Sequence, residues 1–110
     1  MEELKFELPS TTQTIIRDPV LVGVVASGNC EVLVEQSRRT GQGASGNCAV
    51  IVHTSAHGFG PIWQAVVADF SSRRHAGGLQ IEINDVGATP AVVSLRLDQA
   101  LEVWEENGNG

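Results

Sequence analysis

The stretch VLVGVVASGNCEVLVE at residues 20–35 contains two strand patterns separated by a turn signal. Residues 20–25 are apolar on both faces, as in a buried strand. The polar cluster at residues 27–29 then interrupts the run, because Ser, Gly and Asn favour tight reversals. Residues 30–35 alternate, so a second strand returns antiparallel to the first and Ser27 lies at the tip of a β-hairpin. One face of this second strand holds Cys30, Val32 and Val34, and the other holds Glu31, Leu33 and Glu35.

A second strand-like run and a helix follow further along the chain. Residues 48–54 (CAVIVHT) are again β-branched and apolar. Pro61, next to Gly60, marks a helix start, because proline is tolerated at the first helical position. We expect this helix to end near His75, with Gly77 and Gly78 supplying a left-handed cap. Its apolar residues at helical spacing are Ile62, Trp63, Val66, Val67 and Phe70.

The last third of the chain shows both periodicities. Residues 79–83 alternate as a half-buried strand, and residues 85–90 form a turn. Residues 93–97 alternate again and predict a further strand. Leu97, Leu101 and Trp104 then stand at i, i+4 and i+7, which indicates a short closing helix.

These elements predict one small domain over residues 1–110. The chain has 110 residues, of which 42% are hydrophobic, and a chain of this size builds a single core. The expected fold class is α+β: a small two-layer sandwich whose mostly antiparallel sheet of four to five strands carries two helices on one face. Residues 1–18 are read as an arm in which residues 4–8 pair as an edge strand. We expect residues 36–47 to form a mobile loop and residues 107–110 a flexible tail.

The charge balance limits the class of partner. Thirteen acidic residues against seven basic ones give a net charge of −6, and Lys5 is the only lysine. This composition argues against nucleic acid and against an anionic membrane surface. There is no apolar run of membrane-spanning length, and the opening Met1-Glu2-Glu3 lacks the positive start of a secretory signal, so we expect a cytoplasmic protein without membrane insertion. In that compartment Cys30 and Cys48 are expected to remain thiols.

Two conventional kinds of site find weak support. A hydrolase would need Ser27, either His53 or His57, and Asp85, but no G-x-S-x-G elbow is present and the chain has little room for a pocket. A zinc site could use the two histidines with two cysteines. The ligand spacing is wrong for that, because seventeen residues separate the thiols. The sequence therefore predicts neither a catalytic set nor a metal centre.

The pentapeptide ASGNC occurs at residues 26–30 and again at 44–48. The flanking residues differ, so shared turn chemistry explains the match more readily than duplication. In the first copy, Ser27 stands between Ala26 and Gly28, whose small side chains leave its hydroxyl unshielded. From the residues alone, a plain turn remains the simpler interpretation.

Three segments together change that interpretation, because they resemble the acyl carrier subunit of malonate decarboxylase. They are LVGVVASGNCEVLVE at 21–35, IWQAVV at 62–67 and INDVGATPAVVSLRLDQALE at 83–102. A more distant similarity is to the carrier subunit of citrate lyase. The resemblance implies that Ser27 carries 2'-(5''-phosphoribosyl)-3'-dephospho-CoA through a phosphodiester, with Ser45 ranking well behind. The family pattern at this turn is Gly-Ser-Gly-Asp, from which Ala26 and Asn29 depart.

By the same resemblance, the chain is a non-catalytic shuttle. The thiol of the arm bears acetyl, exchanges it for malonyl at a transferase, and presents malonyl to decarboxylase subunits. The implied partners are the malonate decarboxylase subunits, the acetyl and malonyl transferases, and the transferase that attaches the prosthetic group. Asp85 and Arg96, near the GATP turn, are candidates for structural pairing or partner contact. The alternative function is an unmodified interaction domain that docks onto a larger enzyme complex.

Overall fold

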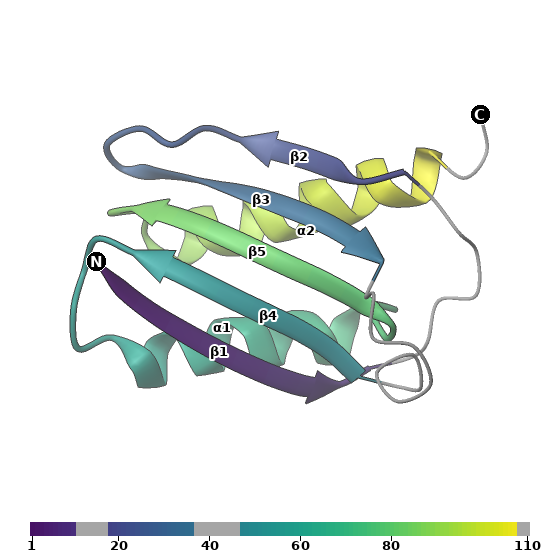
Figure 1. Cartoon of the computed structure of the whole chain (residues 1–110), viewed down its shortest axis with the longest axis horizontal. Helices are drawn as coiled ribbons and strands as arrows, with labels where there is room; N and C mark the ends of the chain where they lie inside the picture. The colour runs from purple at the N-terminus through teal and green to yellow at the C-terminus, as the bar shows by residue number, and fades with distance from the viewer. Residues whose placement is uncertain (11–17, 37–46, 108–110) are drawn as a thin grey trace.

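Five strands and two helices make up the described part of the chain. The computed structural model describes residues 1–10, 18–36 and 47–107. The five strands lie side by side in the order β1-β4-β5-β3-β2 (Figure 1). In chain order the elements are β1 (Glu2–Pro9), β2 (Val20–Gly23), β3 (Asn29–Gln36), β4 (Asn47–Thr54), α1 (Gly60–Arg73), β5 (Leu79–Val86) and α2 (Pro90–Asn107).

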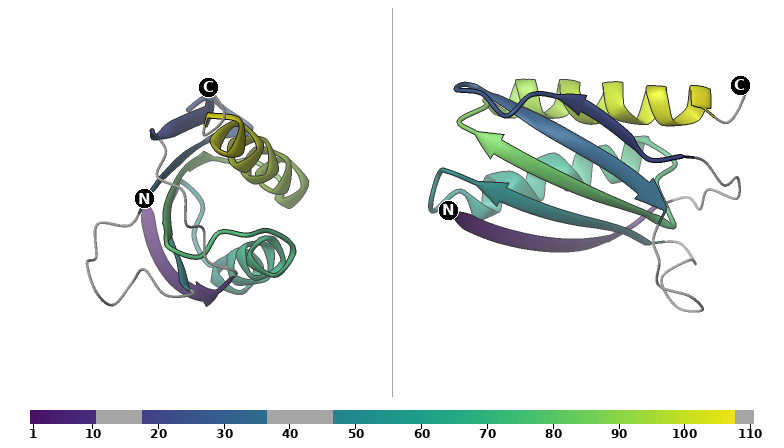
Figure 2. Two further views of the ribbon diagram at one scale, coloured as in Figure 1. Left: turned by 90° about the vertical axis from the view of Figure 1, so that its right-hand side faces the viewer. Right: turned by 45° about the horizontal axis from the view of Figure 1, so that its top comes forward.

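Most neighbouring strands in the sheet are antiparallel. This holds for β1 with β4, β3 with β5, and β2 with β3, whereas β4 and β5 are parallel. Helix α1 connects these two parallel strands, as a parallel pair requires a crossover. Both helices cover the same face of the curved sheet, as the left view of Figure 2 shows. The predicted α+β fold class, with two helices on one face of a mostly antiparallel sheet, is confirmed.

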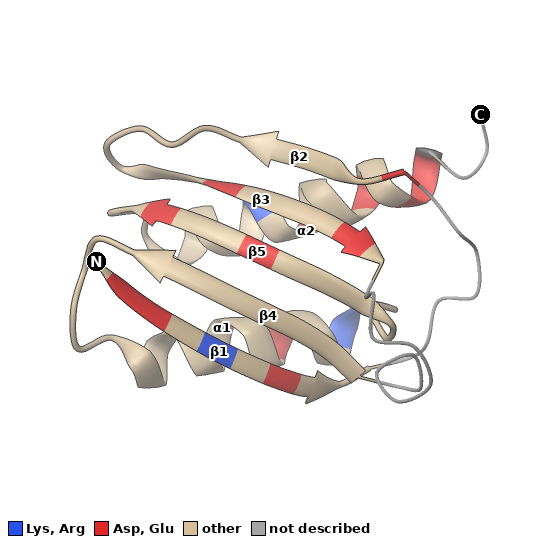
Figure 3. Cartoon of the chain, viewed as in Figure 1, with Lys and Arg blue, Asp and Glu red and all other residues tan. Residues whose placement is uncertain are grey.

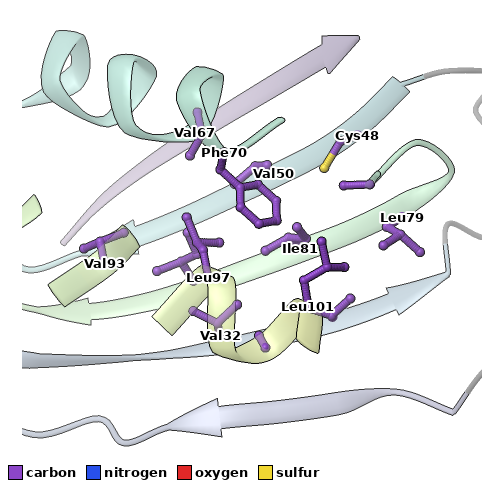
Figure 4. Close-up of a cluster of buried hydrophobic side chains, with 14 of the residues drawn as sticks. Val32, Cys48, Val50, Val67, Phe70, Leu79, Ile81, Val93, Leu97 and Leu101 are labelled. Carbon is purple, nitrogen blue, oxygen red and sulfur yellow. The ribbon is translucent and has the colours of Figure 1, made fainter. Parts of the chain in front are cut away.

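The core lies between the sheet and the helices. Every second residue of β3, β4 and β5 is buried, which is the period of a strand. Phe70 from α1 and Leu97 from α2 converge over the sheet (Figure 4). Trp63, Leu101 and Trp104 are buried in the same layer. Each large apolar side chain removed from water contributes about 1.5–3 kcal/mol, so this layer holds the helices in place.

The strand predicted for residues 93–97 is wrong, because this segment lies inside α2. Val93 and Leu97 are buried, while Leu95 between them is 51% exposed. Burial therefore follows the helical spacing i, i+4 and continues to Trp104. Over only five residues, the pattern fits both the strand period and the helix period. Packing against the sheet favours the helix.

Local chemistry at the start of α2 favours the same outcome. The Thr89 carbonyl accepts a hydrogen bond from the Val93 N–H at 3.0 Å, and its hydroxyl accepts one from the Val92 N–H at 3.3 Å. Pro90, the first residue of α2, has no N–H that would remain unpaired. Residues 89–93 thus form a capped helix start.

The predicted glycine cap of α1 is also wrong. The helix ends at Arg73, and Arg74 takes an extended conformation while its N–H donates to the Phe70 carbonyl. Gly78 does have a positive φ of 84°, but it lies at the turn that enters β5.

Other predictions concern the chain ends and the long loop. The alternating residues 4–8 lie within β1, an edge strand paired with β4, as predicted. Residues 11–17 of the predicted arm, residues 37–46 of the predicted loop and residues 108–110 of the predicted tail lie outside the described residues. No helix in the described ranges combines the length and apolar character needed to cross a membrane.

Candidate functional site

Ser27 occupies the second position of a tight turn between β2 and β3. The Asn29 N–H donates to the Ala26 carbonyl at 2.9 Å, which closes the turn. Gly28 has a positive φ of 77°, as the third position of a type II turn demands, and glycine has the freedom to adopt that value. Ser27 itself is exposed. The predicted hairpin and the position of Ser27 within it are therefore present.

Backbone contacts fix this turn to the neighbouring strand. The Gly28 N–H donates to the Val86 carbonyl at 2.7 Å, and Asn29 forms a bridge with Gly87. On the other side, Gly23 has φ +91°, and a Cβ there would overlap the Cys30 carbonyl. Ser27 is thus held at a defined end of the sheet rather than on a loosely attached loop.

Arg96 reaches the same turn from α2. Its Nε donates to the Asn29 side-chain oxygen at 3.2 Å, and an Nη donates to the Gln99 side-chain oxygen at 2.8 Å. The Asn29 oxygen also accepts the Cys30 N–H at 2.8 Å. Among the lysine and arginine residues of the described part, Arg96 is the one that contacts this turn. It is the blue segment of α2 in Figure 3. A cation therefore lies beside the turn of an otherwise acidic chain.

Asp85 has a structural role, with partners other than Arg96. Its carboxylate is buried and accepts hydrogen bonds from the Thr54 hydroxyl at 2.8 Å, the Gly87 N–H at 3.3 Å and the Ala88 N–H at 2.9 Å. These bonds tie the end of β4 to the turn that follows β5. Asp85 and Arg96 each stabilise the region around the Ser27 turn, but they do not form a pair with one another.

The structure does not bring His53 together with Ser27 and Asp85, the other residues of the hydrolase alternative. That side chain projects from the face of the sheet opposite the helices, and its ring nitrogens lie 3.5 Å from Glu3 and 3.3 Å from Glu82. Asp85 projects from the helix-covered face, where three donors already engage its carboxylate. His57 is exposed in the connection between β4 and α1. The carboxylate is therefore not orienting a histidine.

The two cysteines lie at opposite ends of the sheet. Cys30 stands opposite Asp85 in the register, and Cys48 precedes Ala49, which stands opposite Gln80. At about 3.3 Å per residue this places the thiols roughly 20 Å apart along the strands. Within the described ranges, no group of three or more His, Cys, Asp or Glu side chains is arranged to hold a metal ion.

Both thiols are buried and protonated at neutral pH. Burial, with a smaller contribution from the negative charge of Asp85, raises the pKa of Cys30 to about 11. Burial alone raises the pKa of Cys48 to about 12. Neither thiol has the thiolate character that nucleophilic or metal-binding cysteines need.

An apolar groove beside the Ser27 turn was missed by the sequence analysis. It has a volume of about 250 Å³ and lies between the first turns of α1 and α2. A sequence signal does exist, since Phe59, Ile62 and Val66 form a second apolar stripe at helical spacing next to the buried one. Residues lining the groove include Phe59, Ile62, Trp63, Val66, Ala88 and Pro90.

Comparison with known proteins places this geometry in a family. The family model described as malonate decarboxylase delta subunit (MdcD) matches residues 17–104. The malonate decarboxylase acyl carrier protein of Burkholderia cepacia is 53% identical over 100 residues, covering 91% of this chain and 87% of the relative. The malonate decarboxylase acyl carrier protein of Acinetobacter calcoaceticus is 48% identical over 105 residues, covering 96% of this chain and 98% of the relative.

A solved structure supports the same assignment. A chain in the crystal structure of a Pseudomonas malonate decarboxylase hetero-tetramer in complex with malonate matches this fold with a TM-score of 0.79 at 38% identity. The match covers 94% of this chain and 98% of that chain. The resemblance noted in the sequence is therefore confirmed, and the chain belongs to the malonate decarboxylase delta subunit family.

Proposed function

We propose that this chain is the acyl carrier subunit of malonate decarboxylase, and that Ser27 carries 2'-(5''-phosphoribosyl)-3'-dephospho-CoA through a phosphodiester. The single observation that carries the proposal is the exposed Ser27 on a rigid turn, in a chain whose relatives are named as acyl carrier proteins. The role is that of a carrier and not of a catalyst.

The turn has the properties that an attachment site needs. A transferase must bring its own active site against the serine hydroxyl, so that hydroxyl has to stand clear of bulky neighbours. Ala26 and Gly28 on either side of Ser27 present almost no side chain, and a Cβ placed on Gly28 would meet nothing within 4 Å. The attaching enzyme supplies the base and the metal, so this chain needs only an accessible hydroxyl.

The charges near the turn suit a phosphodiester. The guanidinium of Arg96 lies one hydrogen bond from Asn29, two residues along the chain from Ser27. A phosphodiester on Ser27 adds negative charge at this point, and a neighbouring cation stabilises it electrostatically. The carboxylate of Asp85 also lies near this end of the sheet, but three donors already engage its negative charge.

The bound group would supply a thiol that holds acetyl or malonyl as a thioester. The residues of this chain would hold the base of that arm and leave its far end free for successive partners. The proposed partners are the other malonate decarboxylase subunits, the acetyl and malonyl transferases and the attaching transferase, all in the cytoplasm. Cys30 and Cys48 would not compete for acyl groups, because both thiols are buried.

Intact-mass measurement tests the proposal. Co-expression with the enzymes that build and attach the group should add one increment of nucleotide size to the chain. The increment should disappear in Ser27→Ala and remain in Ser45→Ala, the matched change in the second ASGN copy. An unmodified wild-type chain that still assembles with the other subunits would instead establish the alternative, an interaction domain without a prosthetic group.

A further inference from the structure

We infer that the apolar groove between the first turns of α1 and α2 binds the adenine ring of the arm attached to Ser27; this inference rests on the proposed function. Three features point to this ring: the position of the groove, the reach of the arm and the side chains that line the groove. None of these depends on the reaction that the arm serves.

The groove begins where the Ser27 turn ends. Gly87 lines the groove, and a Cβ placed on it would stand 3.9 Å from the backbone nitrogen of Gly28. The adjoining Val86 carbonyl accepts the N–H of that same Gly28. A group tethered to Ser27 therefore starts at the rim of the groove.

The length of the tether selects adenine from the parts of the arm. Between the serine oxygen and the base lie a phosphate, a ribose and the ribose of the adenosine, or about ten covalent bonds that span at most about 12 Å. Gly87 lines the groove and adjoins Gly28, the residue after Ser27, so a tether of this length suits a base bound there. The thiol lies beyond a further diphosphate and the pantetheine, at the far end of the arm.

The lining of the groove also favours a flat aromatic ring. Phe59 offers exposed aromatic surface, the largely buried Trp63 also lines the groove, and Ile62, Val66 and Ala88 offer aliphatic surface. Aromatic rings stack favourably on one another. The volume of about 250 Å³ is below the range of about 300–1,000 Å³ that holds drug-sized ligands, which suits a single bicyclic base.

The acyl groups suit the groove less well. Malonyl carries a carboxylate, and the lining of the groove includes no basic side chain that could pair with it, so the groove would leave that charge without a partner. Acetyl is too small to fill the space. Phe59 is 47% exposed and Ile62 is 46% exposed in the chain alone, and an adenine ring would cover apolar surface that otherwise faces water.

Binding of the adenine ring in the groove would hold the part of the arm next to Ser27 in one position. With the adenine in the groove, the flexible part begins at the diphosphate rather than at Ser27. The thiol keeps the length of the pantetheine for reaching active sites, and the number of arm conformations to be searched is reduced.

Nuclear magnetic resonance of the modified full-length chain tests the inference. Intact mass first establishes that the nucleotide is present on the wild-type chain and absent from Ser27→Ala. The expected result is a set of nuclear Overhauser effects from the adenine protons to the Ile62 and Val66 methyl groups, with a shift of the Trp63 indole N–H. Ile62→Glu should remove the effects at the Val66 methyl groups and at the Trp63 indole N–H, because it places a carboxylate in the groove. Leu95→Glu should retain them, since Leu95 is similarly exposed, at 51%, but lies outside the lining.

The outcomes separate this inference from the proposed function. A chain without the mass increment contradicts the proposed function, and the inference fails with it. A chain modified on Ser27 whose adenine shows no contact with the groove overturns the inference alone. The same spectra recorded after the other malonate decarboxylase subunits are added provide a second test: contacts to the groove that come only from an apolar segment of such a subunit also overturn the inference, and assign the groove to that partner.

Discussion

The side-chain oxygen of Asn29 accepts a hydrogen bond from Arg96 Nε at 3.2 Å, and this bond joins α2 to the turn that presents Ser27. The two residues are far apart in sequence and meet because β3 and α2 pack against one another. The contact combines two features of the proposed site, a rigid position for the serine and a positive charge beside it.

Replacing Asn29 by Asp should strengthen this contact. The carboxylate retains both hydrogen bonds and makes the one with Arg96 charge-assisted, which is worth about 0.5–1 kcal/mol more at a half-buried site. Urea unfolding of the wild type, Asn29→Asp, Arg96→Ala and the double variant measures the coupling. If Asn29→Asp changes the free energy of unfolding equally in the presence of Arg96 and in the Arg96→Ala background, the contact between residues 29 and 96 is refuted.

Arg73→Ala is the control for this series. Arg73 makes exposed ion pairs with Asp69 and Asp98 and lies away from the Ser27 turn. Because exposed ion pairs contribute little, the substitution should change the free energy of unfolding by roughly 0.5 kcal/mol or less.

Two glycines of the hairpin offer a matched pair of substitutions. At Gly23, φ is +91° and a new Cβ would overlap the Cys30 carbonyl. Gly23→Ala should therefore destabilise the protein by about 3 kcal/mol or more. At Gly28, φ is similar at +77° but the space around a new Cβ is open. Gly28→Ala should therefore cost only the backbone strain, about 1–2 kcal/mol.

Chemical denaturation of the two glycine variants checks both values. A larger loss of stability at Gly28 than at Gly23 would contradict the described geometry of the hairpin.

The cysteines predict a simple reactivity pattern. The pKa values of Cys30 and Cys48 are about 11 and about 12. Both thiols should therefore react very slowly with thiol reagents in the native apo chain at about pH 8, and both should react after unfolding in urea. The modified chain should show one rapidly reacting thiol in the native state, that of the arm. Rapid labelling of two thiols in the native apo chain would show that the strands open there.

The same pKa values predict a loss of stability in alkali. Both folded pKa values lie above the ordinary value of 9.0, so the unfolded thiols release protons first as the pH rises. The free energy of unfolding should fall from about pH 9 upward, by about 1.4 kcal/mol per pH unit for each thiol until its folded pKa is reached. Urea melts between about pH 8 and about pH 10.5 measure the slope. Cys48→Ala should show a shallower slope, although it starts from a lower stability.

The sequence was most informative where one periodicity stood alone. The alternation at residues 30–35 and 79–83 predicted the strands β3 and β5 correctly. The buried strand predicted for residues 20–25 was wrong in extent and burial, because β2 covers Val20–Gly23 at the edge of the sheet, and Leu21, Val24 and Val25 are more than half exposed.

The alternation failed at residues 93–97, where five residues fit both a strand and a helix. At these residues the burial of Leu97 against the sheet favours the helix over the strand. This burial is a tertiary contact, which the local sequence does not contain.

The surroundings of Ser27 required the folded chain. Asp85 was a candidate because of its residue type, but its partner Thr54 lies in another strand that the sequence cannot pair with it. The groove brings Phe59 together with Ala88 from separate segments. The sequence contains the apolar stripe of α1, but the meeting of the two helix starts follows from how they pack on the sheet.

Peptide mapping of the modified wild-type chain tests the central claim most directly. Trypsin cleaves after Arg17, Arg38, Arg39 and Arg73, so Ser27 falls in the fragment 18–38 and Ser45 in the fragment 40–73. We predict that the nucleotide increment is found on the fragment 18–38 and that the fragment ions of this peptide place it on Ser27. An increment on Ser45, or on any residue outside the turn between β2 and β3, would contradict it.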